Sequence, residues 1–365
     1  MEGRKVSVRD AAAVVAAVLR PEIRALSAYT VAQADGMIKL DAMENPFRLP
    51  AEIRAKIASA LADVPVNRYP DGAARGVKRA LRSTLSLPDS VGLILGNGSD
   101  ELIQIITSAL ARPGATMLAP EPSFVMYRLN ALYAGMRFVG VPLAAGFALD
   151  AAAMREAIER EQPALIFIAY PNNPTGNLFE TSAIEDVLQC APGLVVIDEA
   201  YYAFADASFL PRIGEFPNLV VLRTVSKIGM AGVRLGYAVG ASEWTTELDK
   251  VRQPYNLNAL TQAAAPLLLA EGVLLAEQAE ALKGERARLH AALGALRGVE
   301  AVRTQTNFVL ARVPDAPLWF DGLRQRGILV KNLHGTHPLL DHFLRITVGT
   351  PAENDALIAA LQALR

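Results

Sequence analysis

The chain has 365 residues, a length that predicts two or three domains, or one large domain with an accessory one. It carries 36 Lys and Arg against 37 Asp and Glu, so it lacks the basic field that a nucleic-acid-binding protein needs. Hydrophobic residues make up 52% of the sequence, which excludes a disordered chain and allows a large core. Cys190 is the single cysteine, which excludes an intrachain disulfide and a cysteine-rich metal site, and we expect no metal cofactor.

The N-terminal segment contains an apolar stretch over residues 11–19 that follows three basic residues, as in a signal peptide. The stretch is rich in alanine, however, and charge returns at once with Arg20. We therefore expect a surface helix or an N-terminal arm. Apolar runs along the chain are shorter than the ~20 residues that cross a bilayer. Together with the single cysteine, this predicts a cytoplasmic protein that does not bind membranes.

Short apolar runs alternate with stretches of helical period between about residues 90 and 250. Buried parallel strands have continuous apolar sequences, and their alternation with helices is typical of a doubly wound α/β layer. The expected strands cover residues 91–95, 116–119, 137–141, 164–169, 194–198, 219–224 and 235–239. Expected helices among them include 100–111 and 181–189.

The pattern changes after about residue 254. An Ala-, Leu-, Glu- and Arg-rich stretch over 259–296 predicts one or two long helices. Expected strands follow at 307–312, 328–331 and 343–348, with expected helices at 318–326 and 353–364. We therefore predict a large mostly parallel α/β domain over residues 48–253 and a smaller α+β domain formed by 1–47 and 254–365, with residues 1–47 including the N-terminal arm.

Residues 224–227 (TVSK) follow the expected strand 219–224. A lysine beyond the carboxyl end of such a strand lies where ligands bind in open α/β sheets, and lysine is the side chain that forms imines with carbonyl compounds. The hydroxyls of Thr224 and Ser226, with Arg234 seven residues after Lys227, are suited to bind a phosphate. A solvated loop could contain the same residues, so residues 224–227 alone do not distinguish a binding site from an ordinary loop.

The expected strand 194–198 ends in Asp198 and Glu199. A carboxylate at this edge can pair with a protonated heterocyclic nitrogen, or bind magnesium as in nucleotide hydrolases. The second interpretation requires a GxxxxGK[ST] loop, which the chain lacks.

Two turns follow neighbouring strands. Residues 170–176 (YPNNPTG) predict a tight turn that would direct the Asn173 amide into a site. The alternative is an ordinary connection between a strand and a helix. Residues 96–101 (GNGSDE) lead into a helix whose N-terminus would attract an anion, although Ser99 or Asp100 would equally serve as a plain helix cap.

Taken together, the segments resemble the fold type I pyridoxal-phosphate aminotransferases, and within them the histidinol-phosphate aminotransferases. The matching segments occur in order along nearly the whole chain: LDAMENP at 40–46, RYPDG at 68–72, GNGSDE at 96–101, PSF at 122–124, PNNPTG at 171–176, DEAY at 198–201, TVSK at 224–227, RLGY at 234–237 and LRITVG at 344–349. The resemblance implies pyridoxal 5'-phosphate as the cofactor and a homodimer with shared active sites.

The resemblance also implies roles for individual residues. Lys227 would bind the cofactor covalently and move a proton between the substrate α-carbon and the cofactor, while Asp198 would keep the pyridine nitrogen protonated. Asn173 and Tyr201 would contact the phenolic oxygen, and Phe124, otherwise a plain core residue, would stack on the ring. The implied phosphate ligands are Ser99, Asp100, Thr224, Ser226, Arg234 and Tyr69 of the partner subunit. The implied substrate-binding residues are Arg345, Lys331, Tyr29, Asn45 and Asn307.

One position departs from the family pattern. Many relatives carry arginine where this chain has Lys331, and lysine attracts a phosphate as a point charge without the planar fork of a guanidinium. The leading hypothesis is transamination of histidinol phosphate with 2-oxoglutarate, which yields imidazole-acetol phosphate and glutamate. An aromatic-amino-acid aminotransferase and a phosphothreonine decarboxylase share the motif set. A non-catalytic sensor on the same fold is a hypothesis of another class, but the residues before Tyr29 are too few for the DNA-binding segment of such regulators.

Overall fold

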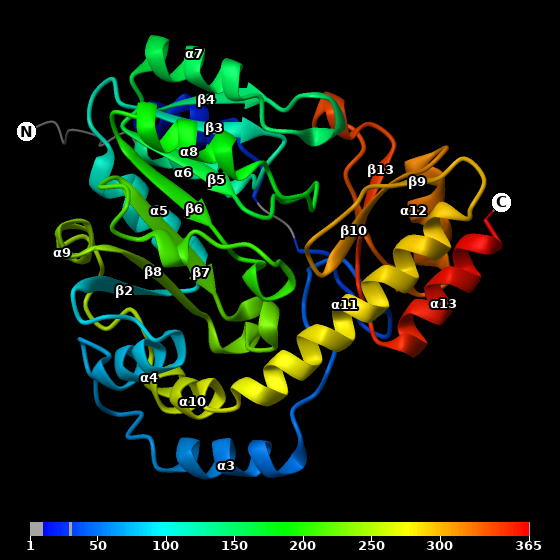
Figure 1. Cartoon of the computed structure of the whole chain (residues 1–365), viewed down its shortest axis with the longest axis horizontal. Helices are drawn as coiled ribbons and strands as arrows, with labels where there is room; N and C mark the ends of the chain where they lie inside the picture. The colour runs from blue at the N-terminus through cyan, green and yellow to red at the C-terminus, as the bar shows by residue number, and fades with distance from the viewer. Residues whose placement is uncertain (1–9, 29–30, 365) are drawn as a thin grey trace, which may run out of the picture.

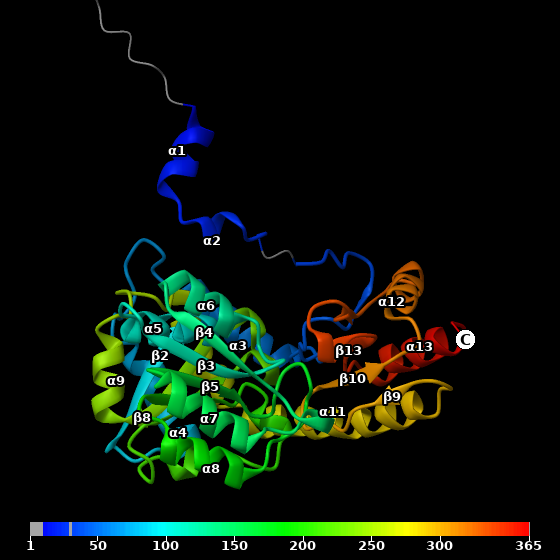
Figure 2. The same cartoon turned by 90° about the horizontal axis from the view of Figure 1, so that it is seen from above.

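The computed structural model describes residues 10–28 and 31–364. A large α/β domain and a smaller sheet domain lie side by side, and the long helix α11 (Gly272–Gly294) runs from one to the other (Figure 1). The N-terminal helix α1 (Ala11–Val18) projects from this body, as Figure 2 shows, whereas α2 (Pro21–Arg24) contacts α6. Helix α1 has no buried residue, which confirms the expected surface helix.

The large sheet has the strand order β2-β8-β7-β6-β5-β3-β4. Its strands are β2 (Val91–Asn97), β3 (Thr116–Glu121), β4 (Arg137–Pro142), β5 (Leu165–Ala169), β6 (Leu194–Asp198), β7 (Leu219–Thr224) and β8 (Leu235–Ala241). Neighbouring strands are parallel except at β8, which is antiparallel to both β2 and β7. Strands β5, β6 and β7 are buried at every residue because helices cover both faces. The predicted doubly wound, mostly parallel sheet is confirmed.

Helices cover the two faces of this sheet through separate apolar clusters. Phe167 of β5 faces the cluster beneath α5 and α6, whereas its neighbour Ile168 faces the cluster beneath α7 and α8, as the two-residue period of a strand requires. The helices of this domain are α3 (Ala51–Ala62), α4 (Arg75–Leu85), α5 (Ser99–Leu110), α6 (Met126–Ala134), α7 (Ala151–Glu161), α8 (Thr181–Cys190) and α9 (Ser242–Asp249).

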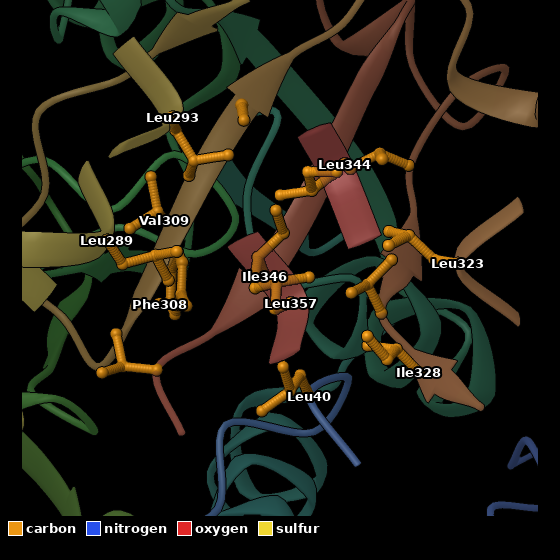
Figure 3. Close-up of a cluster of buried hydrophobic side chains, with 14 of the residues drawn as sticks. Leu40, Leu289, Leu293, Phe308, Val309, Leu323, Ile328, Leu344, Ile346 and Leu357 are labelled. Carbon is orange, nitrogen blue, oxygen red and sulfur yellow. The ribbon is translucent and has the colours of Figure 1, made fainter. Parts of the chain in front are cut away.

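The smaller domain is built on a sheet of order β12-β13-β10-β9, packed against α11 and two further helices. Its other elements are β1 (Ile38–Lys39), β9 (Glu300–Ala301), β10 (Phe308–Arg312), α12 (Ala316–Gln325), β11 (Ile328–Leu329), β12 (Lys331–Asn332), β13 (Phe343–Thr347) and α13 (Pro351–Gln362). Figure 3 shows part of its core, a cluster that includes Leu40, Leu289, Phe308 and Leu357. Leu40 brings the segment after β1 into this core, so N-terminal and C-terminal parts of the chain form one cluster.

One predicted strand is divided in the structure, and one predicted helical stretch forms two helices. The expected strand 328–331 is two short strands in different sheets, because β11 pairs with β1 and β12 pairs with β13. The stretch 259–296, predicted as one or two long helices, forms two, α10 (Ala259–Leu269) and α11, which are bent by 78° at the break between them. Within the described residues, no helix is by itself long and apolar enough to cross a membrane, and this bent pair meets that test only jointly.

The domain division at residues 253 and 254 remains a proposal. Helix α10 packs against α3 and α4, and Leu275 near the start of α11 belongs to the same cluster as β2 and β8. Ala279, one turn later, already belongs to the core of the smaller domain. This packing favours a division inside α11 rather than before α10.

Candidate functional site

A cavity opens beyond the carboxyl ends of β5, β6 and β7, at the junction with the residues after β1. Its wall contains every residue that the sequence predicts to contact the cofactor within one chain: Ser99, Asp100, Phe124, Asn173, Asp198, Tyr201, Thr224, Ser226, Lys227 and Arg234. Ala42, Met43, Glu44, Tyr127, Ala169, Pro171, Ala200 and Ala231 complete the lining. Parallel strands deliver their following loops to one edge, so segments far apart in the sequence meet there.

Lys227 lies in a one-turn 3₁₀ helix, Ser226–Ile228, directly after β7. The turn ends at Gly229, whose φ of 107° suits a residue without a Cβ. The lysine is half-buried, and its Nζ donates to the Ala42 carbonyl oxygen at 3.3 Å. Burial, assisted by the charge of Arg345, lowers the pKa of Lys227 to about 8. A substantial share of the amine is therefore uncharged in mildly basic solution, as a nucleophile toward a carbonyl must be.

Asp198 ends β6, the strand next to β7, and lines the same cavity. Its side chain is 4% exposed, its Oδ2 accepts from the Tyr127 hydroxyl at 2.7 Å, and its Oδ1 accepts from the Ala200 N–H at 3.1 Å. Burial raises the pKa of Asp198 to about 6, although both hydrogen bonds act in the other direction. A buried carboxylate of this kind is stabilised by a cationic group that binds in the cavity.

Part of the cavity lining consists of groups that suit an anion such as a phosphate. Helix α5 begins at Ser99, and the first N–H groups of a helix have no partner within it, so they attract an anion. Gly98 has a φ of 87°, and a Cβ there would lie 2.6 Å from Arg234 Nη2. The positive φ therefore favours glycine, and any larger residue would also displace the Arg234 guanidinium. The hydroxyls of Thr224 and Ser226 lie 3.0 Å apart beside it.

Asn173, Tyr201 and Phe124 also line the cavity. Asn173 Oδ1 accepts from Arg345 Nη1 at 2.6 Å, which leaves the amide N–H groups as the donors available to a ligand. Tyr201 is buried, and burial raises the pKa of its hydroxyl, so it acts as a protonated donor. Phe124 is half-buried, and its ring meets the Tyr127 ring edge-on with centroids 5.7 Å apart.

A second cavity adjoins the first and shares Met43, Phe124, Tyr127 and Asn173 with it. Lys331 and Arg345 are both in its lining. They are directly paired residues of the antiparallel strands β12 and β13, so their side chains leave the sheet on one face. Two cations therefore border the space next to the cofactor position.

Not all predicted site residues meet in these cavities. Asn45 donates to Gln278 at 2.9 Å and accepts from the Phe47 N–H at 2.8 Å, and it lines a different hollow. Asn307 is fully buried and donates to the Met43 carbonyl oxygen at 3.0 Å, so it supports the cavity wall from behind. Tyr69 is 82% exposed and stacks on Tyr255, away from the cavity of its own chain. Tyr29 lies outside the described residues.

Tyr127 is a cavity residue that sequence reasoning missed. Phe124 precedes α6 by two residues, and Tyr127 is the second residue of that helix. The Tyr127 N–H donates to the Phe124 carbonyl oxygen at 3.1 Å, so one turn of the chain holds both residues. Their spacing of three residues was the available signal.

The residues that line the cavity fit pyridoxal phosphate. Lys227 supplies an amine for the aldehyde, Asp198 supplies a buried anion for the pyridine nitrogen, and the α5 N-terminus supplies N–H groups for the phosphate. Each group lines the same cavity, and Asn173 and Tyr201 line it as well as hydrogen-bond donors.

Comparison with protein families and known proteins gives the same assignment. The model of the family "Aminotransferase class I and II" matches residues 35–361. A histidinol-phosphate aminotransferase from Chromobacterium violaceum is 55% identical over 344 residues, which cover 94% of this chain and 97% of that relative.

Two solved structures illustrate the range of the fold. The histidinol-phosphate aminotransferase of Sinorhizobium meliloti, in complex with pyridoxal-5'-phosphate, has a TM-score of 0.85 at 25% identity and covers 94% of this chain and 96% of its own. The L-threonine-O-3-phosphate decarboxylase of Porphyromonas gingivalis has a TM-score of 0.76 at 21% identity and covers 90% of this chain and 99% of its own. The second likeness concerns the fold alone.

Proposed function

Since the chain belongs to the class I and II aminotransferase family and is a pyridoxal-phosphate enzyme, we propose that it transfers the amino group of histidinol phosphate to 2-oxoglutarate. The products are imidazole-acetol phosphate and glutamate. The observation that carries this substrate assignment is the 55% identity to the Chromobacterium violaceum histidinol-phosphate aminotransferase over nearly the whole chain. The pair of cations beside the cofactor cavity supports it, because the substrate carries a phosphate dianion.

The chain's own residues divide the chemical work. Pyridoxal phosphate, when bound, supplies an electron-withdrawing ring that takes up the charge left when a proton leaves the substrate α-carbon. Lys227 Nζ removes that proton, for which a pKa of about 8 is well suited. Asp198 stabilises positive charge on the pyridine nitrogen, while the α5 N-terminus, Thr224 and Arg234 bind the phosphate and fix the ring position.

We assign the two cations different tasks. Arg345 binds the distal phosphate of histidinol phosphate and the α-carboxylate of glutamate in turn, since a guanidinium fork suits both anions. Lys331 is an auxiliary charge for the phosphate only, because a carboxylate already held by the fork has no geometric need for a second cation.

Lys331→Ala should therefore weaken the reaction with histidinol phosphate by about 1–3 kcal/mol, the cost of one lost charged hydrogen bond, and leave the reaction with glutamate nearly unchanged. Arg345→Ala should impair both reactions. The measurement is single-turnover amino transfer from each donor, followed through the cofactor absorbance.

Lys331→Arg is the matched control and should retain the histidinol phosphate reaction. Equal losses for both donors in Lys331→Ala, or no loss for either, would remove Lys331 from the phosphate site. A parent enzyme that prefers phenylalanine, or that releases CO₂ from phosphothreonine, would replace the proposed substrate with one of its rivals. Complementation of a histidine auxotroph tests the same assignment in cells.

We further propose that the enzyme is a cytoplasmic homodimer in which Tyr69 of the partner subunit contacts the cofactor phosphate. Two observations support this arrangement. Tyr69 is 82% exposed and does not line the cavity of its own chain. The projecting helix α1 exposes the apolar side chains of Val14, Val15 and Val18.

Co-expression of Tyr69→Phe with Lys227→Ala tests the sharing of sites. Tyr69→Phe should bind pyridoxal phosphate about tenfold more weakly, because it loses one hydrogen bond to a charged group. In a mixed dimer, one site combines the intact Lys227 with the intact Tyr69 of the partner subunit, so parent affinity should return in half of the sites. Tyr133→Phe, on the exposed side of α6, is the control substitution. No recovery in the mixed dimer would mean that Tyr69 acts within its own chain or not at all.

A further inference from the structure

Tyr127 has contacts that a plain core tyrosine does not need. It is 1% exposed, its ring stacks on Phe167 with centroids 4.6 Å apart, and it meets Phe124 edge-on. Its hydroxyl points out of this aromatic cluster and donates to Asp198 Oδ2 at 2.7 Å. The two aromatic contacts hold the ring, so the position of the hydroxyl follows from packing rather than from the hydrogen bond itself.

The Asp198 carboxylate is held on both of its oxygens. Tyr127 binds Oδ2, and the Ala200 N–H binds Oδ1 at 3.1 Å. The backbone donor belongs to the strand-end turn, so its position is set by β6. Tyr127 belongs to α6, a different element, and the two donors together fix the rotation of the carboxylate about the bond that joins it to Cβ.

We propose that Tyr127 is a positioning residue, which orients the Asp198 carboxylate and keeps it ionised for the pyridine nitrogen of the cofactor. The proposal rests on the proposed role of Asp198 but adds a residue and a task to it. Tyr127 acts through Asp198, so it affects how strongly positive charge on that nitrogen is stabilised and not how the substrate is bound.

The electrostatic surroundings make such a donor necessary. Burial favours the uncharged carboxyl and raises the pKa of Asp198, and the nearby Asp100 and Glu199 act in the same direction. The Tyr127 hydroxyl opposes them, since a hydrogen bond to the charged form favours it. Burial and the charges of Asp198 and Asp100, with Tyr201 nearby, raise the pKa of Tyr127 far above its usual range, so the hydroxyl remains a donor at every working pH.

Tyr127→Phe tests the proposal because it keeps the ring and removes only the hydroxyl. In the protein without cofactor, the Asp198 carboxyl should become about tenfold easier to protonate. The readout is the carboxyl infrared band as a function of pH, assigned to Asp198 by its absence in Asp198→Asn. In the loaded enzyme, kcat should fall about tenfold while KM for histidinol phosphate stays within twofold, and the ¹⁵N resonance of the labelled pyridine nitrogen should move toward the unprotonated form.

Tyr133→Phe, on the same helix but 46% exposed in the parent chain, should leave all three readouts unchanged. Tyr127→His, which restores a hydrogen-bond donor on a ring, should recover part of kcat. An unaltered Asp198 titration in Tyr127→Phe would overturn the proposal, as would a loss confined to KM. The titration needs neither cofactor nor substrate, so it tests Tyr127 even if histidinol phosphate proves to be the wrong substrate.

Discussion

Lys227→Ala is expected to reduce amino transfer by at least about 10⁴-fold, the largest effect of any single substitution in this chain. The side chain supplies both the amine that binds the cofactor carbonyl and the base that removes the substrate proton. Alanine retains neither function. Because the phosphate-binding groups are untouched, the variant should still bind pyridoxal phosphate, but without a covalent bond to the protein.

Borohydride reduction of the loaded parent enzyme should attach the cofactor permanently to Lys227, and peptide mapping should locate it there. Lys250→Ala is the matched control, because Lys250 is an exposed lysine paired with Glu247 on α9. A label on Lys39, Lys250 or Lys331 would contradict the assignment.

The pH dependence of cofactor attachment checks the environment of the same amine. Burial lowers the pKa of Lys227 to about 8 in the protein without cofactor. The uncharged amine is the reactive form, so the rate of covalent attachment should rise with pH and level off above about 8. An ordinary exposed lysine would continue to gain reactivity up to about pH 10.4.

Asp198→Asn is expected to lower amino transfer by about 10²–10³-fold or more, because it removes the anion that stabilises positive charge on the pyridine nitrogen. The asparagine side chain has nearly the same shape as that of aspartate. The Ala200 N–H and the Tyr127 hydroxyl therefore still face a polar atom of residue 198. Cofactor affinity should therefore fall much less than turnover. The measurement is the ratio of the single-turnover rate to the cofactor dissociation constant in the two proteins.

Asp186→Asn on the exposed face of α8 is the control for loss of a carboxylate, and it should leave both quantities unchanged. Near-normal turnover in Asp198→Asn would contradict the assigned role of this residue.

The sequence by itself determined the order of strands and helices and most of the cofactor cavity. Continuous apolar runs predicted β6 and β7 at their observed bounds, because a strand buried on both faces is apolar along most of its length. The chemistry follows directly from these strands. A residue at or just after the end of a parallel strand lies at the carboxyl edge of the sheet, and this rule predicts that Asp198, Thr224 and Lys227 lie together, as they do in the cavity lining.

Tertiary structure alone decided what depends on packing between distant segments. Near residue 330 the chain passes from one sheet to another, because Ile328 pairs with Ile38 while Lys331 pairs with Arg345. No local sequence pattern indicates these partners. Asn307 faces the Met43 carbonyl rather than a substrate, since the fold buries it behind the cavity wall.

The contact between Tyr127 and Asp198 has the same origin. The two residues are 71 positions apart, and they meet because α6 packs on the sheet near the end of β6. Periodicity specifies which face of an element is buried, but it carries no information on which distant side chain lies opposite. That pairing is set by how the layers of the fold are stacked.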